Sequence, residues 1–340
     1  MTQDPKLVLQ ELKENIYRPI YFLQGEETFY IDEISDFIEK NCLEEAQKGF
    51  NQIILYGKDV DVSTILSNAK RFPMMSDRQV VIVKEAQDVK DLNKEAADRL
   101  IDYIKNPLAS TILVFAHKNK VLDGRKALAK TLDKQAVLVT TKKLYDNQVP
   151  NWVQDFIKAK GHAIDQKAVL MVVESVGSDL AKISNELQKV IINFSEKTTI
   201  TADHIQKYIG VSKDYNVFEL QNALGKKDVL KVNRIINYFE KDLKNNPIIP
   251  IIALLYSYYS KVLLCHTSED KSDRGIASLL GVNPFFVKDC KVAATNYPLS
   301  KVLKVISYIK EADLQSKGIV GGAMNEGQIL KELTFKMMHT

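Results

Sequence analysis

Residues 21–33, YFLQGEETFYIDE, have the pattern of a buried strand, a tight turn at Gly25 and the start of a helix. In nucleotide-binding domains such a turn carries glycines and a Lys-Ser/Thr pair, whose N–H groups, ammonium and hydroxyl hold phosphate and magnesium. Here Gly25 is the only glycine and no lysine follows it, while Glu26 and Glu27 stand where phosphate would bind. Two carboxylates at a helix N-terminus satisfy the helix dipole and repel a triphosphate.

Around this stretch, short β runs alternate with helical patterns up to residue 143. The predicted strands are rich in Val, Ile and Leu, and each precedes a helix, which indicates a parallel sheet covered on both faces. These strands span residues 20–23, 52–56, 80–83, 111–115 and 136–140. We therefore expect residues 1–143 to form an α/β domain of the nucleotide-binding type with a degenerate nucleotide site. Its order, an α/β domain followed by helices, resembles that of AAA+ ATPases, which implies an AAA+-like parallel sheet.

The end of the third predicted strand supports the same interpretation. An active ATPase has Asp-Glu here to hold magnesium and orient water, whereas residues 80–86 read VVIVKEA and place Lys84 at the metal-binding position. Because two motifs are altered where they are expected, we predict that the chain does not hydrolyse ATP and uses no cofactor. An active AAA+ ATPase with an unorthodox site is one alternative function.

From residue 144 onward the pattern is helical. We predict a small helical domain over residues 144–210, placed like the lid that follows the α/β domain in AAA+ ATPases, and an all-helical domain over residues 211–340, with apolar stripes around 229–243 and 302–309. Ser178 is the predicted N-cap of a lid helix. The continuous apolar face of that helix comprises Leu180, Ile183, Leu187, Val190, Ile191 and Phe194.

Basic charge is concentrated in one stretch of the chain. The formal net charge is +4, yet residues 118–143 alone carry 8 Lys/Arg against 2 Asp/Glu. These basic side chains suit backbone contact with DNA, an interface with a neighbouring subunit, or a solvated helix face. The candidates are Lys118, Lys120, Arg125, Lys126 and Lys130.

Cysteine and histidine usage predicts no metal site and no disulfide framework. Cys42, Cys265 and Cys290 form no CxxC pair, which argues for reduced thiols in a cytoplasmic protein. The five histidines have no metal-ligand spacing, and no catalytic constellation is found. The N-terminus lacks the apolar core of a secretory signal, and no apolar run approaches the roughly 18 residues needed to span a bilayer. We therefore expect no membrane partner.

Five segments in order resemble the delta subunit family of DNA polymerase III, and together they extend through nearly the whole chain. YFLQGEETFYIDE is similar to the family's opening strand and degenerate turn, and TILVFAHKNKVLDGRKALAKTL (111–132) to its basic strand–helix segment. DLAKISNELQKVIIN (179–193) is similar to its lid helix, VFELQNALGKKD (217–228) to the start of its third domain, and EADLQSKG (311–318) to a segment near its end. The zinc cysteines and Ser-Arg-Cys motif of the ATP-hydrolysing and delta-prime loader subunits are not found in the sequence.

The resemblance implies a subunit that binds and opens the sliding beta clamp, so that partner ATPase subunits (gamma/tau) and delta-prime can load it on primed DNA. It also implies that the first domain contacts the clamp and that the third joins a circular collar of five subunits. The chain would have no active site of its own, although the holoenzyme is a DNA-directed DNA polymerase and hence a nucleotidyltransferase.

The family's clamp-binding element is a short helix just before the third strand, with two adjacent bulky apolar residues. Here that stretch reads AKRFPMMSDRQVVIV (69–83), a departure from the family's more frequent Leu and Phe. Methionine is flexible and polarisable, which suits a protein-binding surface. The alternative is that both methionines plug the base of the sheet. The predicted clamp-binding residues are Met74, Met75, Ser76, Arg78 and Gln79.

Residues 275–297, GIASLLGVNPFFVKDCKVAATNY, have the rhythm of a helix–turn–helix unit with Gly281 at the turn. The second half is too apolar for a DNA-recognition surface, and only Lys288 and Lys291 could reach phosphate. Packing inside a helical collar is therefore favoured, and a stand-alone helix–turn–helix DNA-binding protein is the second alternative function.

Overall fold

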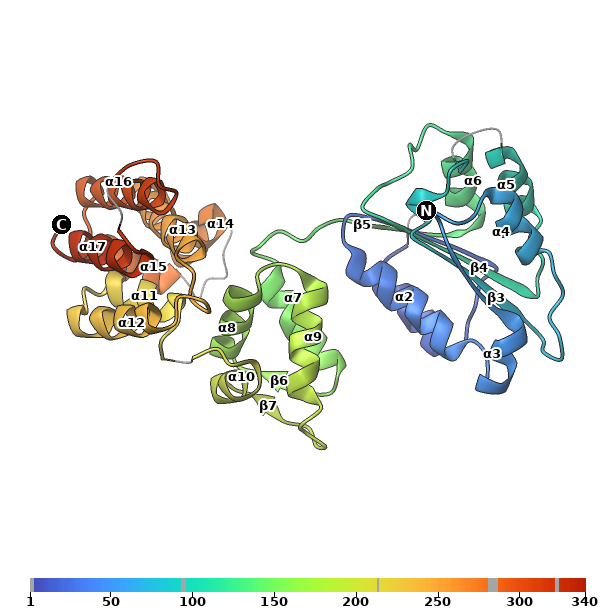
Figure 1. Ribbon diagram of the computed structural model, residues 1–340, viewed down its shortest axis with the longest axis horizontal. Helices are drawn as coiled ribbons and strands as arrows, with labels where there is room; N and C mark the ends of the chain where they lie inside the picture. Colours follow the sequence, from blue (N-terminus) through green and yellow to red (C-terminus); the bar gives the residue numbers. More distant parts are fainter. Residues whose placement is uncertain (1–2, 93–95, 213, 281–286, 322–323) are drawn as a thin grey trace. The chain divides into compact units, whose positions relative to one another are not determined.

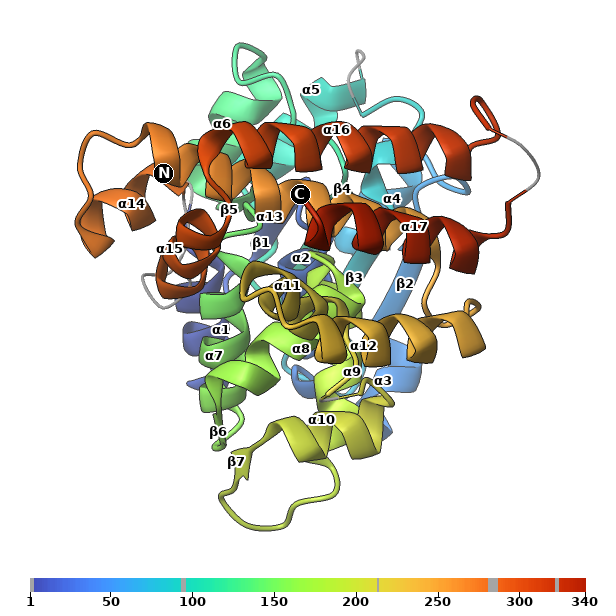
Figure 2. The same ribbon diagram turned by 90° about the vertical axis from the view of Figure 1, so that its left-hand side faces the viewer.

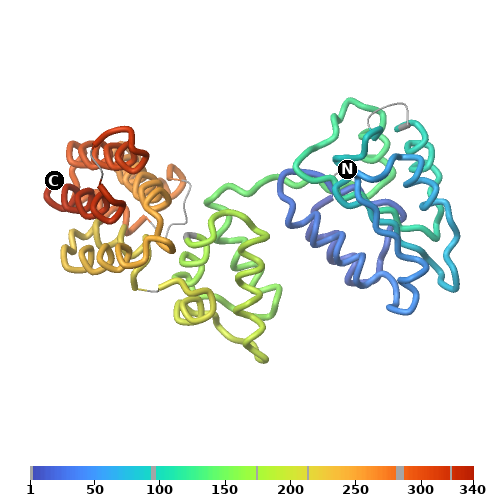
Figure 3. Tube along the Cα trace, viewed as in Figure 1, coloured from blue at the N-terminus to red at the C-terminus, as the bar shows by residue number. Residues whose placement is uncertain are grey.

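The computed structural model describes residues 3–92, 96–212, 214–280, 287–321 and 324–340. The chain forms two compact units, Met1–Leu144 (unit 1) and Tyr145–Thr340 (unit 2), and each is one continuous stretch of the polypeptide (Figure 3). The further division of unit 2 into a lid and a collar stays a prediction.

Unit 1 is organised around a five-stranded sheet with the order β2-β3-β4-β1-β5, in which all neighbouring strands are parallel (Figure 1). All five predicted strands are present, so the predicted fold class is confirmed. Strands β1, β3, β4 and β5 continue past their predicted ends. The strands are β1 (Ile20–Gly25), β2 (Gln52–Tyr56), β3 (Gln79–Lys84), β4 (Thr111–Lys118) and β5 (Val137–Thr141).

Helices cover both faces of this sheet. Successive strand residues point to opposite faces, so Leu23 of β1 packs with α1 and α2, whereas Phe22 packs with α4, α5 and α6. The helices of unit 1 are α1 (Pro5–Lys13), α2 (Thr28–Asn41), α3 (Glu45–Asn51), α4 (Val62–Ala69), α5 (Ala96–Lys105) and α6 (Ala127–Gln135), with a short 3₁₀ turn, η1 (Ala86–Asp88).

The described part of unit 2 contains helices and a two-stranded parallel sheet, β6 (Ala163–Ile164) and β7 (Thr199–Ile200), which the sequence analysis did not predict. Its helices are α7 (Val149–Ala159), α8 (Gln166–Val176), α9 (Leu180–Ile191), α10 (Ala202–Ile209), α11 (Val217–Gly225), α12 (Val229–Lys241), α13 (Ile248–Thr267), α14 (Asp273–Leu280), α15 (Val287–Asn296), α16 (Leu299–Ser316) and α17 (Glu326–Met338). Helix α17 packs against both α12 and α16, and Figure 2 shows the three side by side.

The start of α9 differs from its prediction by one residue. The N-cap is Asp179, whose carboxylate accepts a hydrogen bond from the N–H of Lys182 at 3.1 Å, and not Ser178. Gly177 ends α8 at φ +85, so the chain has one further residue of turn before α9 begins. The carboxylate also complements the helix dipole more strongly than a hydroxyl does.

Helix α13 is long and apolar enough to span a membrane by length and composition alone, which contradicts the expectation that no segment would be. Such a helix is weak support for a membrane span, because the core helix of a soluble protein passes the same test. The core of unit 2 contains eight of its residues, namely Ile248, Ile251, Ile252, Leu255, Tyr258, Tyr259, Val262 and Cys265.

The predicted helix–turn–helix turn at Gly281, with Val282, Phe285 and Phe286, lies outside the described residues. The flanking helices α14 and α15 are described. Lys291 on α15 pairs with the carboxylate of Asp273 and donates to the carbonyl of Lys271, so this predicted phosphate contact is engaged within unit 2.

Candidate functional site

The turn after β1 is closed against the end of β5. The N–H of Glu26 donates to the Thr141 carbonyl at 3.2 Å, and the Thr141 hydroxyl donates to the Glu27 carbonyl at 2.8 Å. Gly25 has φ +133, and a Cβ at this position would collide with the Thr141 carbonyl. The backbone groups that would cradle a phosphate are therefore packed against the domain itself.

The N-terminus of α2 is capped by a carboxylate from the same chain. Glu27 is buried, and its side chain accepts a hydrogen bond from the N–H of Phe29 at 3.1 Å. Glu26 is exposed. Of the two acids predicted to replace a phosphate, one occupies the helix N-terminus and the other extends into solvent.

Lys84, at the carboxyl end of β3, is held by two acids of α2. Its ammonium lies 2.7 Å from the Glu39 carboxylate and 3.8 Å from that of Asp36. Burial alone would lower the pKa of Lys84, but the hydrogen bond and negative charge of Glu39 outweigh burial and raise this pKa above its ordinary value. A cation fixed in this way stands where an active ATPase would hold magnesium.

Lys118, at the carboxyl end of β4, forms a second ionic link across the same sheet edge. Its ammonium lies 2.8 Å from the Asp32 carboxylate of α2 and 3.0 Å from that of Glu85, which follows β3 in a left-handed conformation at φ +51. Burial lowers the pKa of Lys118, but its two acidic partners outweigh burial and raise it. This predicted DNA contact is therefore engaged inside unit 1.

The other four basic candidates are exposed on the β4–α6 segment. Arg125 forms a surface ion pair with Asp123 at 2.9 Å, and such a pair contributes little to stability. Contact of this segment with DNA or with another subunit stays a prediction. These candidates are Lys120, Arg125, Lys126 and Lys130.

Residues 70–78 connect α4 to β3 as an irregular loop, which we call the Met loop. The predicted short helix at this position is wrong. Helix α4 ends at Ala69. In the loop that follows, Pro73 disfavours a helical conformation at Phe72, and Met75 adopts a left-handed conformation at φ +51, so no helix forms there.

Large apolar side chains protrude from the Met loop and from the adjoining end of α3. Met75 is 100% exposed, Met74 54% and Phe72 75%, while Phe50 on the last turn of α3 is 66% exposed. The alternative that the methionines plug the base of the sheet is therefore wrong. Isolated exposed apolar residues are common, but a group of this size is typical of a protein-binding surface.

The buried side-chain amides of Asn51 and Gln79 bind the backbone of the Met loop. Asn51 is hydrogen-bonded to both backbone polar groups of Met74. Gln79 is 2% exposed, and its Nε2 lies within hydrogen-bond distance of the Arg71 carbonyl and the Thr111 hydroxyl. The prediction for Gln79 is corrected accordingly: this side chain supports the loop from inside and cannot reach a partner.

The remaining two predicted residues shape the end of the loop. The Ser76 hydroxyl donates to the Arg78 carbonyl at 3.0 Å, and the Arg78 guanidinium stacks 5.3 Å from the centre of the Tyr17 ring. Both residues are half-buried, so each remains partly accessible.

Beside this turn lies a polar cavity of about 380 Å³, lined by Tyr17, Cys42 and Arg78 among others. Burial raises the pKa of the Cys42 thiol to about 11, although the charge of Arg78 opposes this shift. The thiol is therefore protonated at neutral pH, and Cys42 lacks the low pKa of a nucleophilic cysteine.

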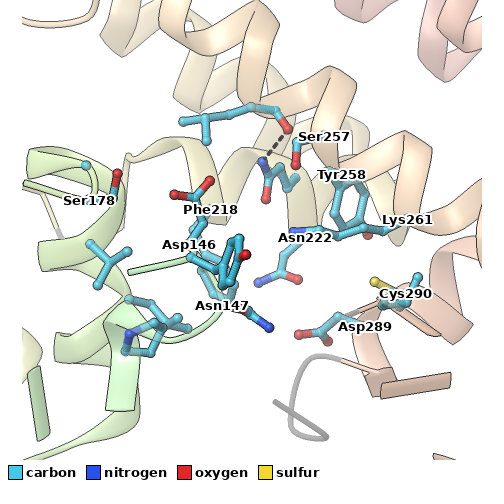
Figure 4. Close-up of a pocket in the computed structure, with 18 residues that line it drawn as sticks. Asp146, Asn147, Ser178, Phe218, Asn222, Ser257, Tyr258, Lys261, Asp289 and Cys290 are labelled. Carbon is cyan, nitrogen blue, oxygen red and sulfur yellow. Dashed lines mark hydrogen bonds between the residues drawn. The ribbon is translucent and has the colours of Figure 1, made fainter. Parts of the chain in front are cut away.

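A larger cavity of about 690 Å³ lies within unit 2 among α8, α11, α13 and α15 (Figure 4). Its charged lining groups are Asp146, Lys261 and Asp289, and burial raises the pKa of Asp289. Among the residues that the structure describes, no group of three His, Cys, Asp or Glu side chains is placed to hold a metal ion.

Sequence reasoning missed Phe50, Asn51 and Phe72. Phe72 lies within residues 69–83, the stretch that contains the predicted clamp-binding residues. Because Pro73 disfavours a helical conformation at Phe72, the exposure of this side chain could have been suspected. Asn51 is remote in sequence and has no motif that marks it.

Two family patterns match the chain. The family described as "DNA polymerase III, delta subunit" matches residues 21–142, and the family described as "DNA polymerase III delta subunit, C-terminal domain" matches residues 214–338. These two stretches cover more than half of the 340 residues.

Individual relatives agree with the family patterns. The DNA polymerase III subunit delta of Bacillus subtilis is 25% identical over 317 residues, which are 91% of each chain. The probable DNA polymerase III subunit delta of Aquifex aeolicus is 26% identical over 263 residues, covering 75% of this chain and 72% of that one. The solved structure of a Bacillus subtilis DNA clamp loader delta protein covers 99% of this chain and 100% of its own, with 24% identity and a TM-score of 0.59. This last similarity shows a shared fold.

Proposed function

The chain belongs to the DNA polymerase III delta subunit family, and from this membership we propose that it is the clamp-binding arm of a clamp loader. In this proposal, Met74 and Met75 enter an apolar pocket on the sliding beta clamp, and unit 1 stabilises the open form of the ring. Partner ATPase subunits (gamma/tau) and delta-prime then use the open clamp for loading on primed DNA.

The observation that carries this proposal is the full exposure of Met75 on a loop anchored by buried amides. A flexible, polarisable side chain fits an irregular apolar pocket, and a rigid base lets that contact bear force. Phe72 in the Met loop and Phe50, which precedes Asn51 on α3, add further exposed apolar surface, and aromatic residues are frequent hot spots of protein interfaces.

Clamp opening then follows from differential affinity. A ligand shifts an equilibrium between two forms only as far as it binds one more tightly than the other. The chain must therefore bind the open clamp more tightly than the closed one. ATP binding by the partner subunits would control when the Met loop is accessible.

The occupied sheet edge supports a role without ATP hydrolysis. Glu27 takes the helix N-terminus, Thr141 closes the turn, and Lys84 is fixed by Glu39 where magnesium would be needed. The chain would act as a mechanical subunit of a polymerase holoenzyme in the cytoplasm, and the partner subunits would supply the energy of ATP.

Unit 2 would join the other loader subunits through residues 211–340, the predicted collar. Helical assemblies pack through apolar stripes, and unit 2 exposes such side chains on several helices. Among them are Leu230, Tyr256, Leu303 and Phe335. Primed DNA within the complex would contact the exposed basic candidates Lys120, Arg125, Lys126 and Lys130 through its phosphates.

The direct test is a titration of the purified chain with the sliding clamp of the same organism, together with a fluorophore pair placed across one subunit interface of the clamp. We expect saturable binding and a loss of energy transfer as the interface opens. Binding that leaves the energy transfer unchanged would limit the role to docking, and absence of binding would contradict the proposal.

A further inference from the structure

The side chain of Asn51 links α3 to the Met loop. It is 1% exposed; its Oδ1 accepts a hydrogen bond from the Met74 N–H at 2.7 Å, and its Nδ2 donates to the Met74 carbonyl at 2.9 Å. The same Nδ2 donates to the Gln47 carbonyl, one turn earlier on α3, at 3.2 Å. Asn51 therefore fixes the backbone of Met74 to a helix.

This arrangement replaces the pairing that a neighbouring strand would provide. A single amide satisfies both the N–H and the carbonyl of Met74, which requires a side chain with a donor and an acceptor. Aspartate at position 51 would keep the acceptor but lose the donor. Leucine, which has a similar volume, would keep neither.

The residue after this anchor has a backbone conformation that needs support. Met75 has φ +51, a region that residues other than glycine rarely adopt, and its fully exposed side chain makes no packing contact that could hold it there. The left-handed backbone of Met75 must therefore be held by the residues before and after it in the chain. Asn51 holds Met74 on one side, and the Ser76–Arg78 hydrogen bond closes the turn on the other.

We propose that Asn51 is a positioning residue for the clamp contact, because it holds Met74 and Met75 in the protruding conformation before the partner arrives. The proposal rests on the proposed function, in which these two side chains enter the clamp. An ordered loop loses less conformational entropy on binding, so Asn51 raises the affinity although it is too buried to touch a partner.

A double-mutant cycle in the full chain tests this role, with the sliding clamp of the same organism as partner. Asn51→Leu should weaken binding by about tenfold, and Asn51→Asp by a smaller factor. In a Met75→Ala chain, Asn51→Leu should reduce the affinity by a clearly smaller factor, while it lowers the Tm equally in both backgrounds. An equal factor in both backgrounds would mean that Asn51 acts independently of Met75 and would overturn the proposal.

A measurement without the clamp separates this inference from the proposed function. The methyl NMR resonances of Met74 and Met75, assigned with alanine variants, should shift and broaden in Asn51→Leu. They should stay in place in Asn193→Leu. Asn193 is a control in unit 2, since it follows the end of α9 and donates to a carbonyl four residues earlier, that of Lys189 at 2.6 Å.

The outcomes of this measurement are distinct. Unchanged methyl resonances in Asn51→Leu would overturn the positioning role. Shifted resonances, combined with a clamp affinity that Met75→Ala does not alter, would show that Asn51 orders the Met loop but would contradict the proposed clamp contact, and with it the role of Asn51 in clamp binding.

Discussion

The ammonium of Lys84 at the end of β3 lies 2.7 Å from the carboxylate of Glu39 on α2. This pair occupies the strand end where an active ATPase holds magnesium through acidic side chains. We therefore expect that the purified chain neither binds Mg-ATP with micromolar affinity nor hydrolyses it above background. Isothermal titration calorimetry and phosphate release measure the two properties, with an ATP-hydrolysing loader subunit as positive control. A micromolar Kd for this chain would contradict the expectation.

Replacing Met74 and Met75 together by alanine should weaken clamp binding by about a hundredfold or more, since buried interface anchors contribute about 2 kcal/mol each and 1.4 kcal/mol is tenfold in affinity. The Tm should hardly change, because both side chains are exposed in the free chain. Surface binding and thermal unfolding are measured on the same samples.

Ile192→Ala is the matched control for that double variant. Ile192 is 80% exposed and belongs to unit 2, whereas the Met loop belongs to unit 1. Its replacement should leave clamp affinity unchanged. Equal losses for the control and the double variant would remove the Met loop from the binding surface.

Gln79→Leu should lower the free energy of unfolding by about 1–3 kcal/mol, because it removes the buried amide donor that lies within hydrogen-bond distance of the Arg71 carbonyl and the Thr111 hydroxyl. Urea unfolding followed by circular dichroism gives the value. Gln10→Leu, at an exposed position on α1, should change the free energy by less than about 0.5 kcal/mol. Full stability combined with reduced clamp affinity would restore Gln79 as a contact residue.

Unit 1 should function without unit 2. Its sheet is covered on both faces by helices of the same stretch, so we expect residues 1–144 to fold alone and to bind the clamp with nearly the affinity of the full chain. The fragment should no longer co-purify with the loader ATPase subunits, since it lacks the predicted collar. Co-purification of the folded fragment with those subunits would argue against the collar role.

Glu219 should make unit 2 sensitive to acid. Burial would raise the pKa of Glu219, but hydrogen bonds from Lys231 on α12 and Lys167 on α8 outweigh burial and lower this pKa below its ordinary value of 4.5. A depressed folded pKa gives stability that is fully present above the unfolded value and is lost as the pH falls through the folded one.

The urea midpoint of Glu219→Gln should therefore lie below that of the unaltered chain at neutral pH, and the difference should shrink as the pH falls below about 4.5. Glu196→Gln removes an exposed carboxylate from the same unit and serves as control. A difference between Glu219→Gln and the unaltered chain that does not change with pH would show that the ionic links of Glu219 contribute nothing to stability.

The sheet of unit 1 could be predicted from sequence because its strands are short runs of Val, Ile and Leu between helical patterns. The residues at the carboxyl ends of β1 and β3 could be predicted for the same reason. Once these two strands are placed, Glu27 and Lys84 fall at defined positions. Periodicity is a strong signal for buried elements, since burial on both faces leaves few polar positions.

The Met loop could not be predicted in the same way. Its conformation depends on Asn51, which lies 23 residues before Met74 in the chain, and on the buried amide of Gln79. The sequence does not distinguish a buried glutamine from an exposed one, so Gln79 was expected at the surface. The left-handed backbone of Met75 has no sequence signal either, because methionine has no preference for it.

The bonds between Thr141 and the turn at Gly25 would make a phosphate site hard to build at this position. Placing a lysine in the turn and an Asp-Glu pair at the end of β3 would still leave the Glu26 N–H engaged by Thr141 and the helix N-terminus occupied by Glu27. Lys118, bridging Asp32 and Glu85, would also have to give way. In the proposed role without ATP hydrolysis, a single substitution would therefore leave the other contacts in place. Several internal contacts would have to be exchanged together before a nucleotide could enter, so the same bonds that order this end of the sheet would also keep it closed to phosphate.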